Sequence, residues 1–212
     1  MTTTSPNVPV SSRKLTIDDI ADARAYERER SELRAHVIEL KQRRRVSLGT
    51  VVTLMFENRD TMRYQIQEMA RVERIFTDAG IQEELDVYNP LIPEPGQLCA
   101  TLFIELTSDD QMREWLSKLV GIEHSVVFRL PDGTPDGSTV RCVADPQHAA
   151  QLTREHVTAA VHYVTFAFTP EQVAAFGDGA VLAIDHPNYL EAVELAPSTI
   201  AELRTDLATD RS

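Results

Sequence analysis

Residues 125–144 read SVVFRLPDGTPDGSTVRCVA, and they carry the main information about the fold class. Two β-prone segments, residues 125–130 and 139–144, flank the loop PDGTPDG. Turn residues between two such segments are typical of a hairpin. A hairpin pairs its strands antiparallel, and helix-like patterns precede and follow it along the chain. The sequence therefore predicts an α+β fold in which a mixed or mostly antiparallel sheet packs with helices.

Further strands and helices are expected on both sides of this hairpin. Apolar patterns predict strands at residues 46–57, 98–106, 157–168, 180–185 and 189–195, and 157–168 has the pattern of a central strand. Apolar periodicity and capping residues predict helices at residues 16–43, 61–78, 82–88 and 146–155, and after Ser108, Thr169 and Pro197. We interpret Gly49 as a bulge or bend in its strand and Gly80 as the end of the helix at 61–78.

The predicted N-terminal helix is long and charged. Thr16 begins it with Asp19 as the capping partner, and its apolar residues form a narrow stripe: Tyr26, Leu33, Val37 and Leu40. Such a stripe is typical of a helix that lies on a domain surface or meets a partner chain. The next helix is expected to bury Met62, Ile66, Met69, Val72 and Phe76.

Length and charge limit the function classes. The chain has 212 residues and a formal net charge of −12. No long linker interrupts it, so we expect a single domain at residues 13–208, between a disordered tail at 1–12 and a short tail at 209–212. The acidic balance disfavours nucleic acid and anionic lipid as partners. No apolar run reaches the roughly 18 residues of a membrane span, and no secretory signal begins the chain, so we expect a cytoplasmic protein without membrane insertion.

The common enzyme signatures are missing from the sequence. The eight glycines form neither a dinucleotide fingerprint nor a phosphate loop. No cysteine pair has zinc spacing, and no serine lies in a nucleophile elbow. Cys99 and Cys142 lie in predicted strands, where we expect free and unreactive thiols. The cofactor, if any, stays unknown.

The helix at residues 63–73 is dense in polar groups. Tyr64, Gln65, Glu68 and Arg71 fall three or four positions apart, so they share one region of the helix surface. One interpretation is a catalytic pair, with Glu68 as base or metal ligand and Arg71 as anion clamp. The alternative is an ion-paired helix flank.

A metal site is a second hypothesis. Glu68, Glu105, His162 and His186 are suitable ligands if the fold brings them together. If its strand face is covered, Glu105 is a buried carboxylate, and such groups are usually paired or functional. The two histidines also have structural interpretations: His162 as a hydrogen-bonded core histidine, and His186 as part of a turn with polar caps.

Two segments are candidates for partner contacts. The stiff proline loop carries Tyr88, Asn89, Leu91 and Ile92, which either dock a partner or plug the protein's own core. The basic cluster Lys41, Arg43, Arg44 and Arg45 either binds an anion or nucleic acid, or complements the negative end of a helix dipole. The acidic chain makes nucleic-acid binding the weakest hypothesis.

Five segments resemble a known family: KLTIDDI (residues 14–20), RRRVSLGTVVTLMFENRDT (43–61), RYQIQEMARVERI (63–75), IQEELDVYNPLIP (81–93) and DHPNY (185–189). With them, residues 13–207 are similar to the bacterial "domain of unknown function 3501" family. The resemblance implies no activity or catalytic residue. Genes of the family often lie beside those for a rubrerythrin and an iron–sulfur oxidoreductase, which implies a redox or oxidative-stress context.

Two functions remain after this reading. The first is an accessory or interaction protein of that redox system, with rubrerythrin-like or iron–sulfur oxidoreductase partners and room for a homo-oligomer. The second is an enzyme or metal-binding protein with a Glu/His/Arg site.

Overall fold

The computed structural model describes residues 13–131, 139–145 and 157–208. Several predicted segments lie partly or wholly outside these residues: the tails at 1–12 and 209–212, most of the loop at 131–137, and the whole of the helix at 146–155.

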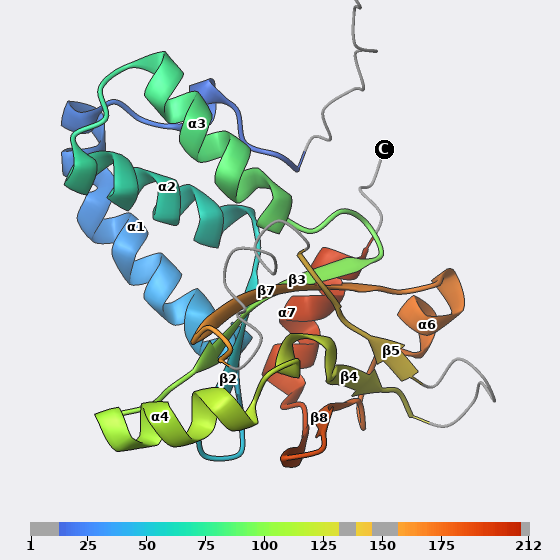
Figure 1. Cartoon of the computed structure of the whole chain (residues 1–212). Coiled ribbons are helices and arrows are strands. Elements are labelled where there is room, and N and C mark those ends of the chain that lie inside the picture. Colours follow the sequence, from blue (N-terminus) through green and yellow to red (C-terminus); the bar gives the residue numbers. More distant parts are fainter. Residues whose placement is uncertain (1–12, 132–138, 146–156, 209–212) are drawn as a thin grey trace, which may run out of the picture.

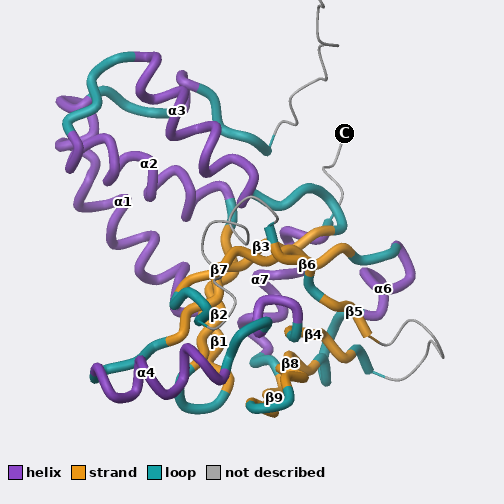
Figure 2. The backbone as a smooth tube through the Cα atoms, viewed as in Figure 1, coloured by secondary structure: helices purple, strands orange, loops and turns teal. Residues whose placement is uncertain are grey.

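The strands form two antiparallel sheets, as Figure 2 shows. Sheet A has the order β1 (Arg45–Leu48), β2 (Val52–Glu57), β3 (Gln97–Ile104), β7 (Val161–Ala167), β6 (Val143–Ala144). Sheet B has the order β5 (Thr139–Arg141), β4 (Val126–Arg129), β8 (Val181–His186), β9 (Tyr189–Glu194). The predicted hairpin is confirmed, because β4 pairs antiparallel with β5. The α+β prediction is therefore correct.

Helices surround the two sheets. The α-helices are α1 (Ala23–Arg44), α2 (Arg59–Glu73), α3 (Asp78–Tyr88), α4 (Asp109–Lys118), α6 (Pro170–Ala175) and α7 (Pro197–Leu207). Three short 3-10 turns are η1 (Ile17–Asp19), η2 (Asn89–Leu91) and η3 (Ile122–His124). Figure 1 shows α1, α2 and α3 side by side as one helical layer.

The main core lies between the sheets. Alternate residues of β2, β3 and β7, such as Phe56, Leu102 and Phe166, turn toward sheet B and are fully buried. Phe128 of β4 meets Phe166 edge to face, with ring centroids 4.8 Å apart. Each such buried ring contributes roughly 2–3 kcal/mol through loss of apolar surface from water.

The opposite face of sheet A lies under the helical layer. Met62 and Ile66 of α2 join Leu85 of α3 in a second apolar cluster. Tyr163 of β7 packs against this cluster from the sheet. The same face carries Glu57 at the end of β2, so polar groups lie between the sheet and the helices.

The long N-terminal helix is divided. Thr16 and Asp19 form the predicted capping box, but they cap only the 3-10 turn η1. The helix α1 begins at Ala23, and the side chain of its N-cap Asp22 accepts hydrogen bonds from two backbone amides of the first turn. Thr16 therefore caps only the short 3-10 turn, whereas Asp22 caps the long helix.

Two glycines have roles other than the predicted ones. Gly49 has φ +67° and lies between β1 and β2, so residues 46–57 form a hairpin and not one bulged strand. Gly80 lies in the first turn of α3, where its amide donates to the Thr77 cap. The preceding helix α2 ends earlier, at Arg74 in the left-handed conformation. Val72 and Phe76 are consequently exposed, contrary to prediction.

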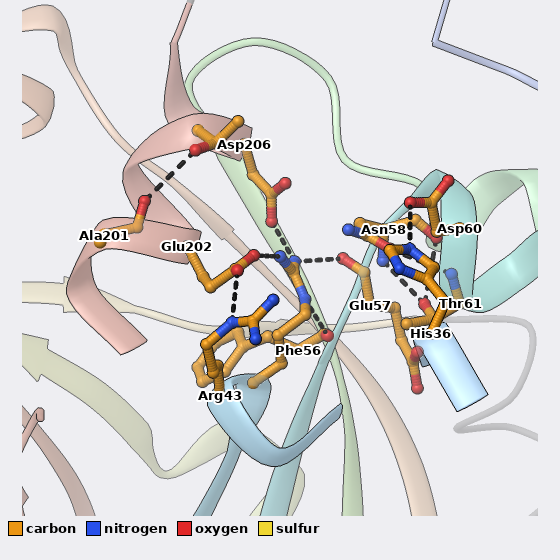
Figure 3. Close-up of polar contacts among 12 residues, drawn as sticks. His36, Arg43, Phe56, Glu57, Asn58, Asp60, Thr61, Ala201, Glu202 and Asp206 are labelled. Carbon is orange, nitrogen blue, oxygen red and sulfur yellow. Dashed lines mark hydrogen bonds and ion pairs between the residues drawn. The ribbon is translucent and has the colours of Figure 1, made fainter. Parts of the chain in front are cut away.

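A buried guanidinium joins the C-terminal end of α1 to the rest of the fold. Arg44 Nε donates to the Phe56 carbonyl at 2.9 Å and Nη2 donates to the Glu57 carbonyl at 3.2 Å. Nη2 also binds the Asp206 carboxylate on α7. Figure 3 labels Phe56, Glu57 and Asp206, the three residues that accept these hydrogen bonds. One side chain thus links α1, β2 and α7.

Candidate functional site

The polar cluster predicted on α2 is an interhelical ion-pair site. Glu68 Oε1 accepts hydrogen bonds from Tyr26 Oη at 2.6 Å and from Arg30 Nε at 2.7 Å. Arg30 Nη2 donates to Oε2 at 3.0 Å, and Arg71 Nη2 donates to the same atom at 3.2 Å. Glu68 therefore binds Arg30 through both oxygens, an arrangement that holds α1 against α2.

This arrangement does not suit a general base. The hydrogen bond from the Arg30 guanidinium, above all, lowers the pKa of Glu68 to about 2. A carboxylate with so low a pKa accepts a proton poorly near neutral pH. Arg71 lies on the same carboxylate, so its contact with Glu68 belongs to the ion-paired flank rather than to an anion clamp.

The four predicted metal ligands do not converge. Glu105 is half-exposed: its Oε1 pairs with Arg45, and Thr53 Oγ1 donates to its Oε2 at 2.6 Å. Its pKa is lowered by the Thr53 hydrogen bond and then by Arg45. Within the described ranges, no three His, Cys, Asp or Glu side chains form a group that could hold a metal ion.

Both histidines are structural. His162 is buried in the core, with Nε2 2.8 Å from Thr158 Oγ1 and 3.0 Å from the Ala159 carbonyl. Burial lowers the pKa of His162. His186 Nδ1 accepts from the Asn188 amide at 3.2 Å, so its Nε2 at 3.0 Å from the Val120 carbonyl is the donor. Each ring nitrogen of His186 therefore already has a partner.

The proline loop plugs the protein's own core. Leu91 and Ile92 are buried in the second apolar cluster. The Asn89 side chain accepts from the Leu15 amide and donates to the Leu15 carbonyl, both at 2.9 Å. Of the four residues predicted for partner binding, three are thus occupied inside the fold, and Tyr88 remains half-buried beside a cavity.

The basic cluster is also used within the molecule. Arg44 is buried on Asp206, Arg43 Nε donates to Glu202 of α7 at 2.7 Å, and Arg45 pairs with Glu105. These contacts favour the structural interpretation for the three arginines of the cluster.

The two thiols are free and buried, as expected. Burial raises the pKa of Cys142 to about 11 and also raises that of Cys99. Thiolate chemistry needs the opposite environment.

Two features escaped the sequence reading, and both adjoin the helical layer. The first is an apolar cavity of about 380 Å³ between η1, α2 and α3. Apolar side chains in its wall are Ile17, Ile20, Ile75, Phe76 and Ile81. Phe76 is 73% exposed, and Val72 in the last turn of α2 is 65% exposed. We call Val72 and Phe76 the α2–α3 corner.

The second feature is a cavity of about 230 Å³ between sheet A and the helical layer. Glu57 and Thr101 line it from the sheet, and Gln65 and Tyr88 line it from the helices. The alternation of β2 places Glu57 on the same face as Met55, a signal that was available in the sequence. What the sequence did not supply was the identity of the elements that cover this face.

Fold and site together define a class: a two-sheet α+β protein whose helical layer covers one sheet and adjoins two cavities. The chain belongs to the family described as "Protein of unknown function (DUF3501)", whose model matches residues 14–207. It is similar to a solved structure, that of a novel protein of unknown function from Burkholderia pseudomallei K96243, with 39% identity and a TM-score of 0.80. The match covers 92% of this chain and 99% of the other. A search of the curated proteins found no match.

Proposed function

We propose that this protein acts as an accessory protein that docks a partner of a cytoplasmic redox system of the rubrerythrin and iron–sulfur oxidoreductase type. The observation that carries the proposal is the α2–α3 corner, where Phe76 is 73% exposed beside an apolar cavity. Exposed apolar surface next to a cavity is typical of protein interaction sites. A partner that covers the corner would remove this surface from water.

The state of the polar residues also supports binding over catalysis. The predicted base Glu68 is held by three side chains, and both thiols are buried. The alternative, an enzyme or metal-binding protein with a Glu/His/Arg site, lacks a converged set of these groups among the described residues. No helix in the described parts of the chain is both long and apolar enough to cross a membrane.

The test is a binding measurement with purified partners. Purified rubrerythrin-like and iron–sulfur oxidoreductase proteins are titrated against the full chain at low and moderate salt, with sedimentation velocity as the readout. The double variant Val72→Ser/Phe76→Ser should weaken binding at least about tenfold, because each anchor is worth on the order of 1–2 kcal/mol.

A matched control is Leu190→Ser on β9, which changes a residue that is 70% exposed on sheet B. This variant should bind normally. The proposal fails if neither partner binds the unaltered protein, or if the corner variant binds as well as the control. A dimer of the protein alone that the corner variant abolishes, without partner binding, would assign the corner to a second copy instead.

A further inference from the structure

Glu57 has an unusual environment for a carboxyl group. Its side chain is 5% exposed at the end of β2. Thr101 Oγ1 donates to Oε1 at 2.8 Å across the β2–β3 ladder. The second oxygen, Oε2, is buried and has no hydrogen-bond partner among the residues that the structure describes. The nearby Arg44 guanidinium binds the backbone carbonyl of Glu57 and not its carboxyl group.

Such an atom carries an energetic cost. A buried acceptor without a donor destabilises a protein, because its hydration is lost and nothing replaces it. Most buried polar atoms have a partner, and exceptions call for an explanation such as a missing ligand. Glu57 lines the cavity of about 230 Å³ together with Thr101, which is the residue that orients it. A donor group placed in this cavity would supply the partner that the protein itself lacks.

The rest of the cavity wall limits what that ligand is. Aromatic and apolar side chains form most of the wall: Met55, Met62, Tyr88, Leu91, Phe103 and Tyr163. Burial raises the pKa of Tyr163, so its phenol stays neutral. The cavity is below the usual range of roughly 300–1,000 Å³ for ligand pockets. A small ligand with an apolar body fits this wall.

A positive charge lies in the same wall. Lys41 of α1 lines the cavity with its ammonium 6.0 Å from the centre of the Tyr64 ring. No carboxylate partner of Lys41 occurs within the described residues. Arg45, the other cation of the wall, is already paired with Glu105. The cavity thus offers one unpaired acceptor and one cation on different elements.

We propose that this cavity binds a small amino acid with an apolar side chain, whose ammonium group donates to Glu57 and whose carboxylate pairs with Lys41. The apolar side chain of the ligand packs against the methionine and aromatic wall. This site is separate from the α2–α3 corner, because the two cavities share no lining residue. Its test is therefore independent of partner docking.

The experiment uses calorimetric titration of the full chain with L-leucine, L-methionine and L-phenylalanine. Each is compared with two truncated analogues, one without the amino group and one without the carboxylate. At least one amino acid should bind, and both of its analogues should bind at least about tenfold more weakly.

Two variants assign the groups. Glu57→Gln keeps the shape, so it should fold with unchanged or higher thermal stability and yet lose at least about tenfold in affinity. Lys41→Met should bind the amino acid and its decarboxylated analogue equally, because the cation that distinguishes them is gone. Asp60→Asn, at an exposed residue outside this cavity, is the matched control and should bind normally.

The proposal is overturned if none of the three amino acids binds the unaltered protein. It is also overturned if Glu57→Gln binds as the control does. Loss of thermal stability in Glu57→Gln, without any ligand effect, would show that the carboxyl group is purely structural.

Discussion

Arg44 and Asp206 lie 162 positions apart in the sequence, and the guanidinium of one binds the carboxylate of the other inside the protein. Arg44 is fully buried, and Glu202 on the next turn of α7 lies 3.6 Å from its Nη1. Burial raises the pKa of Asp206, although Arg44 opposes the shift. The pair therefore holds two charges in a place where neither would be stable alone.

Arg44→Met should be strongly destabilising. Removing one member of a buried pair leaves the other charge without compensation, which costs roughly 3–5 kcal/mol of the free energy of unfolding. Urea unfolding measures the loss. Arg43→Met, at the neighbouring partly exposed arginine that contacts the same helix, should cost much less. Equal losses in the two variants would contradict the special role of Arg44.

Gly49→Ala should also destabilise the protein. Gly49 has φ +67°, which an alanine adopts at a cost of about 1–2 kcal/mol. A new Cβ would in addition lie 2.4 Å from Tyr189 Oη, the hydroxyl that donates to the Leu48 carbonyl at 2.6 Å. Gly177→Ala is the matched control, because its Cβ meets nothing within 4 Å. Thermal unfolding of both variants should show a lower midpoint for Gly49→Ala alone.

The Glu68 ion pair should make the free energy of unfolding depend on pH in the acidic range. The pKa of Glu68 falls from its ordinary 4.5 to about 2 on folding, with the Arg30 hydrogen bond as the main cause. A lowered folded pKa stabilises the protein above the unfolded value, so this contribution is present above pH ~4.5 and is lost toward pH ~2. Glu68→Gln should therefore lose on the order of 1–2 kcal/mol near neutral pH.

Urea unfolding as a function of pH checks this prediction. The curves of Glu68→Gln and the unaltered protein should approach each other as the pH falls through that window. Glu73→Gln, an exposed glutamate of the same helix, should run parallel to the unaltered protein. A constant gap between the Glu68→Gln curve and the unaltered protein at every pH would show that the pair contributes no acid-dependent stability.

His162 should make the free energy of unfolding depend on pH in a second range, above that of Glu68. Desolvation by burial lowers the pKa of His162 below its ordinary 6.5. The unfolded chain then binds the proton more readily than the folded one, so stability falls as the pH drops below about 6.5. His162→Gln should therefore make the free energy of unfolding less dependent on pH below about 6.5. A slope in His162→Gln equal to that of the unaltered protein would refute the assignment.

Local patterns predicted many elements correctly. The Thr169 cap with Pro170 begins α6 as expected, and the Ser108 cap begins α4. These signals succeed because a cap acts within one turn of its own helix. The predictions for Gly49 and Gly80 were wrong because the role of a glycine is not decided within its own turn. A glycine permits several backbone conformations, and only the surrounding chain selects between a hairpin turn, a helix start and a helix end.

The candidate sites were less predictable, since they depend on contacts between distant segments. Glu68 and Arg71 were recognised as neighbours because they lie three positions apart on one helix. Their decisive partner Arg30 is 38 positions away from Glu68, on another helix, and no periodicity indicates it. Glu57 ended a predicted strand, but the pattern of one strand does not say which helices cover its face.

During synthesis by the ribosome, the Arg44–Asp206 contact can form only after α7 has been made. The helix that carries Arg44 emerges early, and α7 emerges after nearly all other elements. Until α7 is made, the charge of Arg44 has no carboxylate from α7 to pair with. The nascent chain therefore cannot complete its packed core. A transcript truncated before α7 should therefore yield a polypeptide that chaperones and proteases recognise as incomplete.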